Sequence, residues 1–167
     1  PETPAILKAG ARILYVSNEH PEALERMRPD AGLEARVRAA AKMLRAAKRM
    51  TVTSAAGTDL DIDMTGASTV GIWGWTENPG TLAHWPGGIV VSFPKSGTVN
   101  GTLVLDRGDV NLTFKRYLEA PVTLTLEQDY VTRIEGTGAD AEMMRSYLAA
   151  WGDREAYAVS HVGFGMN

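Results

Sequence analysis

Three histidines are the side chains of this sequence best suited to acid–base or metal chemistry. They are His20, His84 and His161. An imidazole changes its protonation near neutral pH and binds metal ions through a neutral ring nitrogen. The sequence contains no cysteine, which excludes disulfides, thiolate nucleophiles, zinc ribbons and iron–sulfur clusters. Without thiolates, the metal ligands to consider first in this chain are imidazole nitrogens and oxygen atoms.

His161 lies at the end of a strand that the apolar pattern predicts over residues 156–162, next to Gly163-Phe164-Gly165. A strand-end histidine beside a flexible Gly-x-Gly turn can face a cleft and serve as a ligand. The alternative is an ordinary core histidine with its hydrogen bonds satisfied. The two glycines are not a dinucleotide-binding fingerprint, because neither a third glycine nor a helix follows them.

His84 falls in an unusual segment, GIWGWTENPGTLAHWPGG, at residues 71–88. The segment reads as a long loop, and long loops within compact domains are usually functional or disordered. Its tryptophans argue against disorder, because such rings bury large areas. One interpretation is a pocket with aromatic walls and with Glu77 and His84 as its polar groups. The other is a Trp-rich corner that fills a small core, and the residues leave both open.

Two further groups of side chains are weaker candidates for a metal site. His20 and Glu22 form an H-x-E pair that can hold a metal, although the same residues suit the start of a helix. Asp59, Asp61 and Asp63 alternate with apolar residues. They lack the glycine and glutamate of a calcium loop, so we expect three carboxylates on the solvent face of a strand.

Hydrophobic periodicity predicts the elements that position these residues. An apolar run predicts a buried strand over residues 12–17, and a helix should lie between Pro21 and Pro29. A second helix is predicted over residues 31–50, with an apolar stripe and a basic surface that either binds phosphate or faces solvent. Further strands are predicted over residues 59–64, 89–93, 102–105, 110–114, 122–126 and 130–134, followed by a helix over residues 140–151 that Asp140 would cap.

These elements indicate a mixed α+β and α/β chain in two parts. Residues 1–50 read as the C-terminal part of an α/β domain, and residues 51–167 read as a β-rich α+β domain that is incomplete. Because the first residue is not Met and the last follows a strand closely, we expect an internal fragment of a longer polypeptide. A formal charge of −3 and the lack of a long apolar run predict a cytoplasmic protein without a nucleic-acid or membrane partner.

Four stretches together resemble the 2,5-dihydroxypyridine 5,6-dioxygenases, iron enzymes of bacterial nicotinic-acid breakdown. They are GTDLDIDMTG, GWTENPGTLAHWPGG, APVTLTLEQDYVTRIEG and SHVGFGMN. The resemblance implies a fold shared with thermophilic metallo-aminopeptidases. Where those peptidases carry a glutamate ligand before the glycines, this sequence has His161, and it has glycines where they draw a second glutamate. Both departures favour the dioxygenase branch.

The resemblance also implies a site for Fe(II) formed by two histidines and one carboxylate, which leaves positions for substrate and O2. By this likeness His161 is the first iron ligand and His84 is a substrate-lining catalytic residue. The other two ligands of the family form a His-x-Asp pair, and no such pair occurs in this sequence. We therefore expect the chain alone to be inactive and free of iron.

The function implied is ring cleavage of a dihydroxylated pyridine by O2 in nicotinate degradation, by an enzyme that could form a homo-oligomer. Two alternatives stay open. One is a metallo-aminopeptidase-like hydrolase that cleaves peptides with zinc or cobalt. The other is a non-catalytic module that binds aromatic ligands through the Trp-rich segment.

Overall fold

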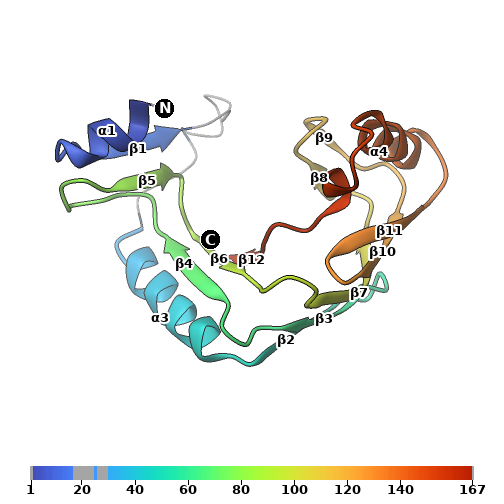
Figure 1. Cartoon of the computed structure of the whole chain (residues 1–167), viewed down its shortest axis with the longest axis horizontal. Coiled ribbons are helices and arrows are strands. Elements are labelled where there is room, and N and C mark those ends of the chain that lie inside the picture. The colour runs from blue at the N-terminus through green and yellow to red at the C-terminus, as the bar shows by residue number, and fades with distance from the viewer. Residues whose placement is uncertain (1, 17–24, 26–29, 167) are drawn as a thin grey trace. The chain divides into compact units, whose positions relative to one another are not determined.

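The computed structural model of the protein describes residues 2–16, 25 and 30–166 (Figure 1). Contacts within the chain group it into two compact units. Unit 1 comprises residues 1–46, 68–92 and 162–167, and unit 2 comprises residues 47–67 and 93–161. The elements are α1 (Glu2–Lys8), β1 (Ile13–Val16), α3 (Leu33–Ala46), β2 (Arg49–Thr53), β3 (Asp59–Asp63), β4 (Ser68–Ile72), β5 (Leu82–Trp85), β6 (Ile89–Phe93), β7 (Val99–Leu105), β8 (Val110–Asn111), β9 (Arg116–Tyr117), β10 (Val122–Glu127), β11 (Tyr130–Glu135), α4 (Ala139–Ala150), a 3-10 helix η1 (Arg154–Tyr157) and β12 (Val162–Gly165).

Unit 2 is built around a five-stranded antiparallel sheet in the order β11-β10-β7-β3-β2. Strands β2, β3 and β10 alternate between more and less buried residues, as the period of two predicts. In β3, Leu60 and Ile62 are buried between exposed aspartates. The strands predicted near residues 60, 103, 124 and 132 are confirmed. The predicted turn at Gln128-Asp129 is also confirmed, and both residues adopt positive φ there.

Two expectations for unit 2 are wrong in detail. The strand predicted over residues 110–114 ends at Asn111, because the side chain of Asn111 accepts a hydrogen bond from the backbone N–H of Phe114 (3.2 Å) and turns the chain toward β9. Asp140 does not cap α4. The N-cap is Gly138, without a side-chain hydrogen bond, and Asp140 lies buried in the first turn.

Unit 1 contains α3, which packs against β4. The apolar stripe predicted for this helix is confirmed, since Leu33, Val37, Ala41 and Leu44 are all buried. The contact with β4 requires a glycine, because a Cβ at Gly71 would lie 2.7 Å from Cγ1 of Val37. The predicted helix extends too far: residues 49 and 50 belong to β2, where β-branched Thr and Val residues favour the extended backbone.

The strands of unit 1 form a parallel pair, β1-β5, and a sheet in the order β12-β6-β4. The strand predicted over residues 156–162 is wrong. Residues 154–157 form η1, which the side chain of Asp153 caps, and the strand comprises the glycine segment itself. Gly163 is not in a turn, because it pairs with Val91 so closely that a Cβ would lie 2.5 Å from the carbonyl oxygen of Val90.

The mixed α+β class is confirmed. The elements α1, β2, β4, β5, β9 and η1 were not predicted, and most of the helix predicted between Pro21 and Pro29 lies outside the described residues. The division into domains at residue 50 stays a prediction. In the part of the chain that the structure describes, every helix is too short or too polar to cross a bilayer.

Candidate functional site

His161 directly precedes β12 and has an exposed side chain with two defined contacts. Its ring nitrogen Nδ1 lies 2.6 Å from Oγ of Ser160, within hydrogen-bond distance. Its ring also lies beside the ring of Phe93, with 5.8 Å between centroids and an angle of 54° between planes. The imidazole therefore has Nδ1 engaged, and Nε2 is the ring nitrogen left for a ligand.

His84 lies on β5, where parallel pairing with β1 places it opposite Tyr15. The two rings are 5.3 Å apart between centroids and inclined at 60°. The imidazole is exposed, so it is held at the surface of unit 1 by an aromatic neighbour. Tyr15 was not singled out from the sequence, because pairing between strands so far apart along the chain leaves no local signal.

The Trp-rich segment contains regular secondary structure and lines a cavity. It is not one long loop, because it includes the end of β4 and all of β5. A pocket of about 530 Å³ opens in unit 1, a size typical of small-molecule sites. The aromatic walls expected for it are present, and Glu77 is not among the lining residues. Those that line it include Arg38, Trp73, Trp75, Asn78 and His84.

Arg38 gives this pocket a positive charge. Its guanidinium lies over the ring of Trp73, 4.1 Å from the centroid, a cation–π arrangement. Glu34, one turn earlier on α3, accepts a hydrogen bond from Nε of Arg38 at 2.7 Å. The arginine is thus held at the pocket by a carboxylate and an aromatic face.

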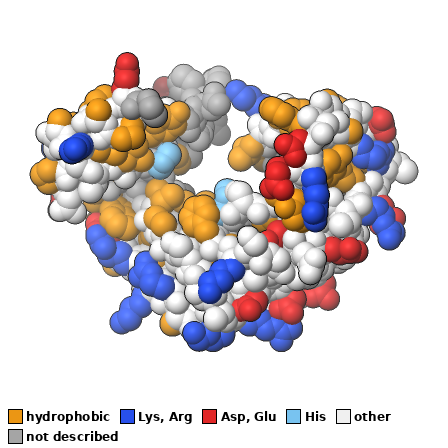
Figure 2. Space-filling view, viewed as in Figure 1, with side chains coloured by type: hydrophobic (Ala, Val, Ile, Leu, Met, Phe, Trp, Pro, Cys, Tyr) orange, Lys and Arg blue, Asp and Glu red, His pale blue; other side chains and the backbone are white. Residues whose placement is uncertain are grey.

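The basic surface of α3 does not form a cluster of free cations. Figure 2 shows Lys and Arg side chains over the helix, at the lower left. Arg36 forms an ion pair with Asp30, and Arg45 donates a hydrogen bond to the carbonyl oxygen of Thr69 (3.0 Å). These contacts favour the interpretation of a solvated helix surface over a phosphate site.

The aspartates of β3 are engaged by neighbours in unit 2. Arg49 forms two hydrogen bonds with Asp61, at 2.5 and 3.1 Å, and these lower the pKa of that carboxyl. The backbone N–H of Thr65 donates to Asp63 (2.8 Å) and lowers the pKa of Asp63. The arrangement agrees with the expectation of solvent-facing carboxylates in preference to a calcium loop.

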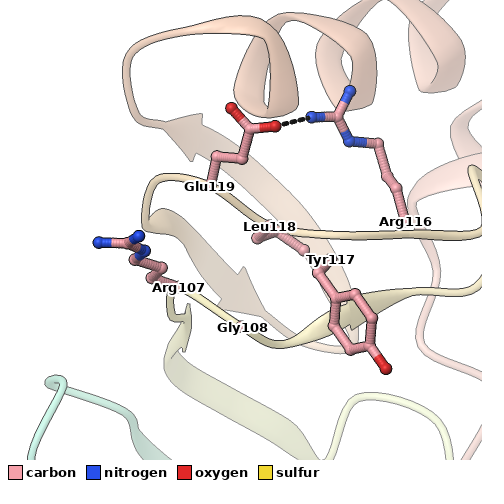
Figure 3. Close-up of a pocket in the computed structure, with 6 residues that line it drawn as sticks. All are labelled: Arg107, Gly108, Arg116, Tyr117, Leu118 and Glu119. Atoms are coloured by element: carbon pink, nitrogen blue, oxygen red, sulfur yellow. Dashed lines mark hydrogen bonds and ion pairs between the residues drawn. The ribbon is translucent and has the colours of Figure 1, made fainter.

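A second pocket, of about 630 Å³, lies on unit 2 and was not predicted (Figure 3). Figure 3 shows Arg116 directed toward Glu119, with a contact of 3.0 Å. Nε of Arg116 also lies 3.2 Å from the buried carboxylate of Asp140, which accepts a hydrogen bond from the backbone N–H of Glu119 (2.8 Å). Two carboxylates thus neutralise the charge of the Arg116 guanidinium. The contact of Arg116 with Asp140 links β9 to α4.

The described residues contain no cluster of three His, Asp or Glu side chains that could hold a metal ion. The pair His20 and Glu22 lies outside them. His84 belongs to unit 1 and His161 belongs to unit 2. Each histidine therefore has its own set of neighbours, and their roles stay predictions.

Comparison with known proteins identifies the family. The chain matches the 2,5-dihydroxypyridine 5,6-dioxygenase family over residues 1–167. It is 40% identical over 166 residues to the 2,5-dihydroxypyridine 5,6-dioxygenase of Pseudomonas putida KT2440, which covers 99% of this chain and 47% of that protein. The chain thus spans about half the length of this relative.

Solved structures extend the comparison. The structure of 2,5-dihydroxypyridine dioxygenase from Pseudomonas putida KT2440 matches with a TM-score of 0.89 and 40% identity, over 100% of this chain and 48% of that one. Wild-type AmpT from Thermus thermophilus matches with a TM-score of 0.62 and 18% identity, over 98% of this chain and 57% of that one. The second likeness concerns the fold alone and confirms the expected aminopeptidase-like architecture. The chain belongs to the 2,5-dihydroxypyridine 5,6-dioxygenase family.

Proposed function

We propose that this chain is part of an Fe(II)-dependent dioxygenase that opens a dihydroxylated pyridine ring with O2 in nicotinate degradation, and that the chain alone is inactive. The observation that carries the proposal is the family match over all 167 residues, together with 40% identity to a relative of that name. The substrate class follows from the name of the relative, 2,5-dihydroxypyridine 5,6-dioxygenase. Homo-oligomerisation and a cytoplasmic location stay predictions.

His161 is the residue of this chain that would hold the iron. An exposed imidazole with Nδ1 engaged by Ser160 offers Nε2 as a donor, and imidazole suits ferrous iron. His161 thus fits one position of a site with two histidines and one carboxylate, and the His-x-Asp pair implied for the others does not occur in the sequence. Bound iron would supply the redox chemistry that the reaction with O2 requires.

His84 is the residue that would move a proton. A neutral imidazole can accept the proton of a ring hydroxyl and return it at a later step, because its ordinary pKa lies near neutral pH. The contact with Tyr15 limits how the His84 ring can turn, and the pocket that His84 lines has aromatic walls suited to a flat ring. These contacts support a role in binding and orienting the substrate hydroxyl.

The test measures O2 uptake and loss of 2,5-dihydroxypyridine by the full-length protein that contains this chain, supplied with Fe(II). His161→Ala should abolish iron binding while the circular dichroism spectrum stays unchanged. His84→Asn should retain iron and lower turnover by about 10²- to 10⁴-fold, the usual size of a proton-transfer contribution. Iron bound at the normal stoichiometry in His161→Ala would refute the ligand role. Peptide cleavage with zinc or cobalt and no O2 uptake would refute the proposal as a whole.

The pocket of unit 1 supports a second candidate function, the binding of aromatic ligands without turnover. Trp73, Trp75 and Arg38 together offer stacking surfaces and a cation. This candidate expects ligand-dependent quenching of tryptophan fluorescence that Trp73→Leu weakens, with no metal-dependent reaction. Turnover that requires Fe(II) would reject it in favour of the dioxygenase.

A further inference from the structure

The ring of His161 is restrained although it is exposed. In the antiparallel pair β6-β12, Val162 lies opposite Ser92, so the same register brings His161 beside Phe93. Phe93 contacts the imidazole ring, and Ser160 engages one of its nitrogens. An exposed histidine without such contacts samples several rotamers, so these two contacts limit where Nε2 can point.

The contact at Nδ1 also bears on the tautomer. A neutral imidazole carries one proton, so one ring nitrogen donates and the other accepts. If Nδ1 carries the proton, it donates to Oγ of Ser160 and Nε2 keeps its lone pair. If the Ser160 hydroxyl donates to Nδ1, then Nε2 carries the proton and cannot bind a cation in that state. The role of Ser160 thus decides whether His161 is ready to act as a ligand.

We propose that Ser160 is a positioning residue that holds His161 in the tautomer protonated at Nδ1, so that Nε2 is presented to a divalent cation. Histidines that bind metals through one nitrogen usually donate from the other to an oxygen, which fixes both the tautomer and the ring orientation. Oγ of Ser160, 2.6 Å from Nδ1, supplies that oxygen. Phe93 supplies the second restraint by limiting ring rotation. The identity of the cation rests on the proposed function, whereas the tautomer does not.

The tautomer can be measured directly on this chain by long-range ¹H–¹⁵N NMR spectra. The spectra are recorded at about pH 8.5, two units above the ordinary pKa of a histidine side chain, which is about 6.5. His161→Gln assigns the signals by their loss. We expect a protonated Nδ1 and an unprotonated Nε2 in the natural chain. Ser160→Ala should shift both signals toward the mixture of a freely rotating histidine, and Ser160→Thr, which keeps the hydroxyl, should restore them.

A proton on Nε2 in the natural chain would overturn the inference, and so would signals that Ser160→Ala leaves unchanged. The backbone amide signals of β6 and β12 serve as the control for folding, because a structural role alone would move them together with the ring. Ser146→Ala, an exposed serine on α4, should leave the His161 signals where they are.

The cation is tested separately by Fe(II) binding to the full-length protein that contains this chain. Ser160→Ala should weaken the affinity by about 10- to 100-fold, and Ser160→Thr should recover most of it. Unchanged affinity in Ser160→Ala would refute the positioning role. If the full-length protein binds no iron while the tautomer is as expected, the proposed function fails and the assignment of the tautomer stands.

Discussion

Unit 2 and unit 1 are assembled from the chain in different ways. In unit 2, β2 pairs with β3 and β10 pairs with β11 as hairpins, and β7 joins the two hairpins by pairing with β3 and β10. In unit 1, three separate stretches of chain meet, so β1 pairs with β5 and β6 pairs with β12. Unit 2 thus depends largely on pairing between strands close in the sequence, with β3–β7 as its long-range pair, whereas unit 1 depends on contacts between distant segments.

Both candidate histidines obtain their aromatic neighbours through pairing between strands that are distant in the sequence. Tyr15 reaches His84 only through the parallel pairing of β1 and β5. Phe93 reaches His161 where the distant strands β6 and β12 run side by side. The aromatic restraint on each histidine is therefore a product of long-range pairing.

The strongest test of the local pattern in unit 2 is Ile62→Ala. Ile62 is fully buried on the inner face of β3, so its truncation should lower the free energy of unfolding by about 2–5 kcal/mol. Urea denaturation measures the change. Val110→Ala is the matched control at an exposed strand position, and it should stay within about 0.5 kcal/mol. Equal effects of the two variants would show that alternation does not define this core.

Gly163→Ala tests the long-range pairing in unit 1. The new Cβ would lie 2.5 Å from the carbonyl oxygen of Val90, so β12 and β6 must move apart at a cost of about 1–3 kcal/mol. Gly165→Ala in the same strand is the control, because the nearest atom to its Cβ, the carbonyl oxygen of Gly88, is 4.0 Å away. Thermal denaturation compares the two. A Gly163→Ala protein as stable as Gly165→Ala would contradict the close pairing.

Asp140→Ala tests a polar anchor of unit 2. The change leaves the backbone N–H of Glu119 without its acceptor and removes one partner of Arg116, so we expect a loss of about 1–3 kcal/mol. Glu142→Ala in the same turn of α4 removes exposed contacts with Arg145 and Ser146 and should cost less than about 1 kcal/mol. Chemical denaturation at neutral pH measures both. A negligible effect of Asp140→Ala would show that α4 is held by apolar contacts alone.

The smallest effect concerns the exposed pair of Arg49 and Asp61. The hydrogen bond from Arg49 lowers the pKa of Asp61 below its ordinary value of 3.8. The contribution of the pair to stability is therefore present above about pH 4 and is lost as the pH falls through the lowered pKa. NMR titration of Arg49→Met should show the pKa of Asp61 rising toward 3.8. The pKa of Asp63, lowered chiefly by the N–H of Thr65, should not move.

Features that depend on local sequence were predicted better than features that depend on contacts between distant segments. The alternation around Ile62 and the turn at Gln128-Asp129 are local signals, and both were read correctly. Gly163 was misread as a turn residue, because its role becomes evident only when Val90 lies beside it. His84 and His161 were selected by residue type and resemblance. Their contacts with Tyr15 and Ser160 could not be predicted, because periodicity carries no information on side-chain partners.

The pairing of β6 with β12 has a consequence for folding during synthesis on the ribosome. The chain emerges from its N-terminus, so β6 is made long before β12, and most of unit 2 is synthesised between them. During that interval β6 has one edge with unpaired backbone groups, an open template for association with another nascent chain. The hairpins of unit 2 need no such delay, because each strand finds its partner within the stretch just made. Pairing of Val162–Gly165 with β6 therefore follows the pairing of β1 with β5 during synthesis, and the β6 edge stays open until then.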